Sequence, residues 1–350
     1  MSELEQQSLW AQRLAERRND YDVTNTVRVS SPSAVCAAVH GIFSSLYPRD
    51  SFKPMSRAFL DFQRLFNGEY PGYYGCDTVY HDIQHTLDMT LANARLIAGF
   101  EMSNPIRDQL GPRRAVVALV TSLFHDAGYI RRHDDDEFSN GADVTSFHVS
   151  RSARFLENYM PHIGFADFAA TAAQIVHFSG YEVRPEQIRV AEPKDRRLGH
   201  LLGTADLMAQ MADRCYLEKC RDRLYPEFVL AGIAVEKDGH GNETVNYASG
   251  DDLLKKTDDF YRNSVKTRLE NSFESVYEYA NVLFDGTNPY LMAIEKNLAY
   301  LRHIASRGDG IGLALRRRPE CFTWPEETLE NVIALAEHRL VRKEASAAVR

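Results

Sequence analysis

Two histidines four residues apart are the first feature of this sequence that could do chemistry. His81 and His85 lie in the segment Tyr80-His-Asp-Ile-Gln-His85, and Asp88 follows about one helical turn later. Residues i and i+4 of an α-helix project from the same face, so both imidazoles could reach one metal ion or one substrate atom. Histidine pairs with this spacing hold divalent ions, but they also occur as ordinary hydrogen-bonded side chains. Both roles are open for this pair alone.

Of the three His-Asp dipeptides in the sequence, only one ends a long apolar stretch. His125 and Asp126 directly follow the segment Ala115 to Phe124. An imidazole and a carboxylate that are buried there need partners, and a metal ion satisfies both. The alternative is that Asp126 caps a helix or forms a salt bridge. The dipeptide at His133 lies in a charged run, which is typical of a solvent-exposed loop.

Three more polar side chains lie inside apolar segments with helical spacing. His148 and His177 are isolated, and such a histidine is more often a hydrogen-bonded core residue than a ligand. Asp206 lies among Ala, Leu and Met residues, with Gln210 and Asp213 on the same helical face. A carboxylate in these surroundings needs a strong partner. All these segments could converge on the interior of one helical bundle.

The segments that carry these residues have the length and apolar spacing of helices. We therefore predict an all-α bundle, with Asp77 as the N-cap of its first long helix. Short alternating arms around a Gly-rich turn predict a small β-hairpin insertion near residues 233–247. Besides a helical leader, the predicted helices cover residues 78–99, 113–124, 144–160, 165–178, 197–219, 251–283 and 326 to about 343.

The composition is that of a globular protein. Of the 350 residues, 44% are hydrophobic and 26% are charged, and 41 basic against 49 acidic side chains give a formal charge of −8. That balance argues against general nucleic-acid binding. Five scattered cysteines without a Cys-x-x-Cys pair indicate neither a disulfide framework nor a thiolate zinc site, and they favour a reducing cytoplasm. We expect no membrane span, because no stretch reaches about 18 apolar residues, and no signal peptide.

In chain order these residues resemble the HD-domain superfamily of metal-dependent phosphohydrolases, and most closely its cyclic nucleotide phosphodiesterase branch. Tyr80-His-Asp-Ile-Gln-His85 is similar to that branch's Tyr-His-Asn-x-x-His motif. Leu123-Phe-His-Asp126 matches its central His-Asp, and Thr204-Ala-Asp-Leu207 matches its later Ala-Asp-Leu segment. The resemblance covers about residues 60–215. Tyr129 stands where the phosphodiesterase pattern has a further histidine.

The resemblance implies a role for each matching position. His85, His125, Asp126 and Asp206 would hold one divalent ion, and Asp126 would also bridge to a second ion. His81 would be the general acid. The metal would be manganese, magnesium, zinc or iron. Two further histidines fall where many HD-domain proteins have ligands of the second metal ion: His148 and His177.

The implied reaction is hydrolysis of a phosphodiester, with a cyclic nucleotide as the leading substrate, by water that the metal ions activate. His81 would protonate the leaving oxygen, because an imidazole titrates near neutral pH. Three polar side chains near the motifs are candidates for substrate contacts, although an exposed position on a helix is the more common role of such arginines: Arg131, Arg151 and Gln210.

Alternatives to this function stay open. Other HD-domain reactions are hydrolysis of a nucleotide or phosphomonoester, cleavage of a cyclic dinucleotide, and oxygenation at a di-iron site. His148 and His177 would favour this group of reactions if they are ligands, since extra histidines suit iron or manganese. A non-catalytic regulatory module stabilised by metal is a further possibility. We predict a helical N-terminal extension over 1–59, an HD-like catalytic core over 60–215, and a C-terminal helical region over 216–350. That last region carries no chemical motif, and we expect it to contact the core or a second copy in a homodimer.

Overall fold

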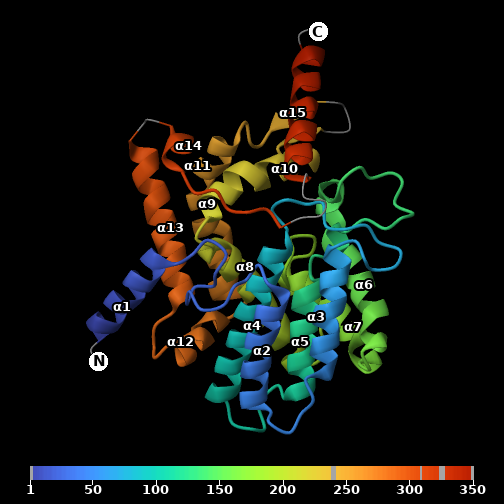
Figure 1. The fold of residues 1–350 in the computed structure, drawn as a ribbon, viewed down its shortest axis with the longest axis vertical. Coiled ribbons are helices and arrows are strands. Elements are labelled where there is room, and N and C mark those ends of the chain that lie inside the picture. Colours follow the sequence, from blue (N-terminus) through green and yellow to red (C-terminus); the bar gives the residue numbers. More distant parts are fainter. Residues whose placement is uncertain (1–2, 238–241, 308–309, 323–327, 348–350) are drawn as a thin grey trace.

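The chain folds into helices almost throughout (Figure 1). The computed structural model describes residues 3–237, 242–307, 310–322 and 328–347. Within these ranges the only strands are β1 (Val235–Lys237) and β2 (Glu243–Val245), an antiparallel pair with Val235 opposite Val245. The predicted all-α fold with a small hairpin is therefore confirmed, while most of the turn of the hairpin lies outside the described residues.

Several helices begin where a proline stands in their first turn, as expected from its fixed φ and missing N–H. This holds for α2, α3, α5, α8 and α13. The helices before the hairpin are α1 (Glu3–Glu16), α2 (Pro32–Leu46), α3 (Lys53–Phe66), α4 (Ile83–Ser103), α5 (Pro112–Phe124), α6 (His148–His162), α7 (Ala169–Ile175), α8 (Pro193–Ala212), α9 (Tyr216–Lys219) and α10 (Tyr225–Leu230). Those after it are α11 (Gly250–Phe260), α12 (Tyr279–Leu283), α13 (Pro289–Ser306), α14 (Ile311–Ala314) and α15 (Thr328–Ala347).

Helix α4 is the centre of the bundle, and it contacts α2, α5, α8 and α12. It is buried on almost every side, which is typical of a helix in the middle of a core. Its buried polar side chains therefore need internal partners. Arg95 bonds to the Asp22 carboxylate at 2.5 Å and to the Tyr290 hydroxyl at 2.8 Å. In Figure 1, α2, α3, α4 and α5 run side by side in the lower half of the molecule.

The start of α4 differs from the prediction, which placed the N-cap at Asp77. The helix begins at Ile83, and Asp82 is its N-cap, with a side-chain oxygen 3.0 Å from the His85 backbone nitrogen. Asp77 instead accepts hydrogen bonds from the Gly141 backbone nitrogen (2.8 Å) and from a guanidinium. His81 consequently precedes the helix, and it does not share a helical face with His85.

One large hydrophobic core extends from Leu14 to Leu315, so all three predicted segments of the chain contribute to it. A smaller core joins α10 to α15 through Val229, Leu230, Val332 and Ala336. Helix α15 therefore lies on α10, and the rest of it projects from the top of the molecule (Figure 1). Over the described ranges, no helix combines the length and the apolar character needed to cross a membrane.

Helices α4 and α12 approach so closely that only glycine fits at the contact. A Cβ atom on Gly99 would lie 1.8 Å from the carbonyl oxygen of Tyr279, which is far inside van der Waals contact. The backbone of one helix or the other would have to move to accept any side chain at this position.

We expect Gly99→Ala to lower the free energy of unfolding by about 2–3 kcal/mol, because relieving this overlap moves backbone rather than a flexible side chain. The matched control is Gly41→Ala in α2, where a Cβ would meet nothing within 4 Å. There alanine should raise the free energy of unfolding by about 0.5–1 kcal/mol. Urea unfolding followed by circular dichroism measures both changes, and shifts in the same direction would contradict this account of the α4–α12 contact.

Candidate metal centre

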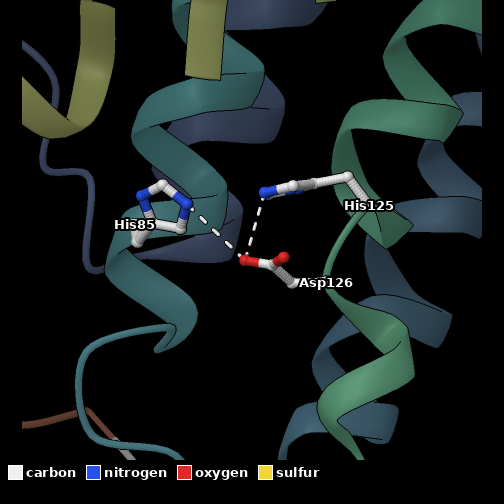
Figure 2. Close-up of side chains that lie close together, drawn as sticks. All are labelled: His85, His125 and Asp126. Atoms are coloured by element: carbon white, nitrogen blue, oxygen red, sulfur yellow. Dashed lines mark ion pairs between the residues drawn. The ribbon is translucent and has the colours of Figure 1, made fainter. Parts of the chain in front are cut away.

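Four of the predicted ligands meet in one cavity of about 400 Å³. His85 comes from the first turn of α4, His125 and Asp126 directly follow α5, and Asp206 comes from the middle of α8. Because α4 contacts both α5 and α8, residues distant in the sequence lie close together here. In Figure 2 the imidazoles of His85 and His125 point toward the same carboxylate oxygen of Asp126.

The distances within this cluster are those of polar groups that share one centre. The Oδ2 atom of Asp126 lies 3.1 Å from Nε2 of His125 and 3.5 Å from Nε2 of His85. Oδ1 of Asp206 lies 3.3 Å from Nε2 of His85 and 3.9 Å from Nε2 of His125. His85, His125 and Asp126 each offer a ligand atom within 4.8 Å of the others, so this group could hold a metal ion.

Three buried polar atoms of the cluster have no hydrogen-bond partner among the described residues. These atoms are Nε2 of His125, Oδ2 of Asp126 and Oδ1 of Asp206. Nδ1 of His125 lies 2.8 Å from the Ser122 carbonyl oxygen and therefore donates to it, so Nε2 is the ring nitrogen that a metal ion could bind after displacing its proton. Buried groups without partners are costly, and a divalent cation would satisfy all three. The residues present thus fit a metal ion.

The ionisation of the cluster follows from its close packing. Burial alone would raise the pKa of Asp126, but the neighbouring imidazoles, His125 above all, outweigh it and hold this pKa well below its usual range. Burial alone would lower the pKa of His125, but Asp126 raises it to about 9. Without a cation, a proton on His125 balances the carboxylate. A bound metal ion would displace that proton, so metal affinity should fall on acidification.

His81 lines the same cavity, although it precedes α4 and does not lie on a helical face with His85 as predicted. Its Nδ1 lies 2.7 Å from Oε2 of Glu227, a residue of α10 whose side chain is only 1% exposed. The other carboxylate oxygen of Glu227 accepts the Tyr80 backbone N–H at 2.5 Å. Although burial opposes it, this carboxylate raises the pKa of His81. The pair fixes the ring and favours a proton on it.

His148 and Tyr129 form the wall beside this pair. The Tyr129 ring stacks between His81 (centroids 4.5 Å apart) and His148 (4.2 Å), so a flat aromatic ring separates the two imidazoles. His148 donates from Nδ1 to the Thr145 carbonyl oxygen at 2.7 Å, and its Nε2 lies 3.7 Å from Oδ1 of Asp126. The predicted second-metal residue His148 is thus next to the cluster. Gly128 permits this approach, because its Cβ would lie 1.8 Å from the His148 carbonyl oxygen.

The structure does not bring the remaining predicted residues together. His177 lines a separate cleft beyond α7, and Arg131 and Arg151 are engaged outside the cavity. Arg131 bonds to Asp77 at 2.8 Å, and Arg151 bonds to the Gly128 carbonyl oxygen at 2.8 Å. Neither arginine is among the described residues that line the central cavity. Gln210 does line it, with its amide oxygen 3.3 Å from the Tyr80 hydroxyl.

The region after residue 216 supplies more of the site than its lack of motifs suggested. Besides Glu227, it provides much of the apolar wall, including Phe228, Tyr247 and Phe260. This region was expected to contact the core or a second copy. Nothing in the local sequence distinguishes Glu227 from an exposed helical glutamate, because its role depends on the position of α10 beneath the Tyr80–His81 backbone.

This fold and site define a helical protein with a buried imidazole–carboxylate centre suited to a divalent cation. Residues 72–286, more than half of the chain, match the Npun_R2479-like family, and the protein belongs to that family. The matched part contains every residue of the cluster, and it extends through Glu227 and the hairpin. The chain matches no curated protein and no solved structure.

Replacing a ligand should weaken metal binding without unfolding the protein. We expect Asp126→Asn to lower the affinity for Mn²⁺ or Zn²⁺ by roughly 100-fold or more, since loss of an outer-shell partner alone costs about 10- to 100-fold. The control is His133→Ala in an exposed loop, which should bind metal like the unaltered protein. Titration calorimetry and the metal content after dialysis measure both. Equal affinities in the two variants would contradict the assignment.

Proposed function

We propose that this protein is a metal-dependent phosphohydrolase of the HD-domain type that hydrolyses a phosphodiester. The observation that carries the proposal is one cavity lined by His85, His125, Asp126 and Asp206, three of whose buried atoms lack a hydrogen-bond partner, and by His81, which Glu227 holds. A metal centre beside a positioned acid is what hydrolysis of a phosphoester requires. The motif resemblance to HD-domain phosphodiesterases supports the same chemistry.

Each side chain has a defined task in this reaction. A divalent ion held by the cluster would supply a Lewis acid for the phosphoryl oxygens and an activated water at neutral pH. Asp126 and Asp206 place negative charge at the centre and so favour the cation. Glu227 accepts from Nδ1 of His81, which orients the ring and supports its protonated state, and Nε2 can then give a proton to the leaving oxygen.

The charge of the cavity favours a substrate with a single negative charge. Among the described residues that line it, Lys256 is the only lysine or arginine. Its amine already bonds to Asp252 at 3.0 Å and to the Asn246 carbonyl oxygen at 2.5 Å. Nucleoside triphosphates are usually held by several cationic side chains, whereas a diester has one charge that the metal centre itself can balance.

The aromatic side chains that line the cavity favour an aromatic or apolar group on that diester. The cavity is lined by four such side chains: Tyr181, Phe228, Tyr247 and Phe260. Rings of this kind hold flat apolar groups by stacking and burial. A cyclic nucleotide combines a flat base with one phosphodiester charge and is therefore the leading substrate. The other HD-domain reactions would be favoured by His148 and His177 as ligands, and His177 lies in another cleft.

The direct test is hydrolysis of bis-p-nitrophenyl phosphate by the full chain loaded with Mn²⁺. We expect turnover that a chelator abolishes and that falls by at least roughly 1,000-fold in Asp126→Ala, because the centre supplies several kcal/mol of charge stabilisation. The dianionic monoester p-nitrophenyl phosphate should react more slowly. A folded, metal-loaded protein that turns over neither this diester nor a panel of cyclic nucleotides would refute the proposal and favour a regulatory module.

The role of His81 is tested through its partner. We expect Glu227→Gln to lower the pKa of His81, so the fall of kcat at high pH should move to lower pH. The loss of kcat should be roughly 10- to 100-fold for a cyclic nucleotide, whose alkoxide must be protonated. The loss should be small for bis-p-nitrophenyl phosphate, because p-nitrophenolate leaves unaided. Equal losses for both substrates, with metal content retained, would show that Glu227 does not act through the acid.

A further inference from the structure

A second cavity, separate from the metal centre, is lined by arginines. It has a volume of about 420 Å³ and lies between the end of α1, the first turn of α4 and the segment around Pro319. Gln84 of α4 lines it, whereas the next residue, His85, lines the metal cavity. The cationic side chains of the cavity, here called the arginine cavity, are Arg17, Arg18, Arg214 and Arg318.

These guanidinium groups bond mostly to neutral acceptors. Arg17, whose exposed fraction is only 4%, donates to the Ala212 carbonyl oxygen at 2.7 Å. Arg214 donates to the Ala15 carbonyl oxygen at 3.0 Å, and Arg18 donates to the side-chain oxygen of Asn25 at 3.2 Å. Within the described ranges, no ion pair joins any of the four arginines to a carboxylate. Their charges are therefore balanced only at a distance.

The carboxylates of the arginine cavity do not cancel this charge. Of the two that line it, Asp20 is paired with Arg28 at 2.6 Å, and Glu320 is exposed. The pKa of the Asp213 carboxyl is lowered. Burial opposes this shift, Lys219 makes the largest contribution to it, and the charge of Arg17 adds to it. Arg18, Arg214 and Arg318 keep an excess of positive charge at the cavity.

The arginines repel one another, and one of their N–H groups has no acceptor. Nε of Arg214 is buried and without a hydrogen-bond partner in the part of the chain that the structure describes. Burial, followed by repulsion from Arg317 and Arg17, lowers the pKa of Arg214. Burial and the same group of arginines lower the pKa of Lys296. An anion in the cavity would relieve this repulsion.

We propose that the arginine cavity binds a small anion with two or more phosphate groups, such as pyrophosphate or a nucleoside diphosphate, without a metal ion. Guanidinium groups pair with phosphate oxygens through two parallel N–H bonds, and four of them on one cavity exceed what a single phosphate can use. The volume is also larger than one phosphate group. The proposal is independent of the phosphohydrolase function, because none of its residues belongs to the metal centre.

Calorimetric titration of the full chain with inorganic pyrophosphate in the presence of a chelator tests the site, since binding at the metal centre is then eliminated. We expect one saturable site per chain, with inorganic phosphate at least roughly tenfold weaker. Arg18→Gln and Arg318→Gln should each weaken binding by roughly tenfold, because each removes a charged contact to phosphate. Arg318 is exposed and its guanidinium bonds to the carbonyl oxygen of the neighbouring Arg317 at 3.3 Å, so Arg318→Gln should unfold at the temperature of the unaltered protein.

The matched control is Arg107→Gln, which removes an arginine that is 86% exposed and lies outside the arginine cavity. It should bind pyrophosphate as tightly as the unaltered protein. Failure to observe saturable binding would overturn the proposal, as would equal affinities in Arg18→Gln, Arg318→Gln and Arg107→Gln. Phosphate that binds as tightly as pyrophosphate would overturn the assignment to anions with several phosphate groups.

Discussion

The structure depends on burying two carboxylates and two imidazoles at the meeting point of α4, α5 and α8. Asp126 and Asp206 lie in an otherwise apolar interior, and their oxygens face His85 and His125 at 3.1 to 3.9 Å. Such a group is stable only if a proton or a cation balances it. The three helices that supply it are also those that form the middle of the core, so the site and the fold share one set of contacts.

The surroundings of this cluster hold the remaining side chains in position. Asp82 caps α4 and so fixes the direction of His85, while Gly128 lets the loop after α5 lie against the start of α6. Tyr129 then separates His81 from His148 by stacking between them. Glu227 reaches the site from α10, which α15 covers, so helices far along the chain support the acid that the proposed reaction uses.

Two cavities with opposite charge lie on adjacent residues of α4. The cavity that His85 lines contains carboxylates and imidazoles, which suit a cation. The arginine cavity, which Gln84 lines, suits an anion. Asp82, the N-cap of α4, lies 3.4 Å from the buried Arg223. Arg223 in turn donates to the carbonyl oxygens of Pro319 and Glu320. The N-cap of α4 is thus linked through Arg223 to the segment that borders the arginine cavity.

The sequence by itself determined the helical class and the hairpin, because apolar spacing is a local signal. Its resemblance to HD-domain proteins also pointed to His85, His125, Asp126 and Asp206, the four residues that the structure brings together. It did not determine where α4 starts, since Asp77 and Asp82 are both good caps and only the contacts of Asp77 with Gly141 and Arg131 exclude it. Tertiary structure alone placed Glu227 under His81, moved His177 to another cleft and assembled the arginine cavity. Each of those outcomes is a contact between residues distant in the chain, and no local pattern encodes which distant side chain will arrive.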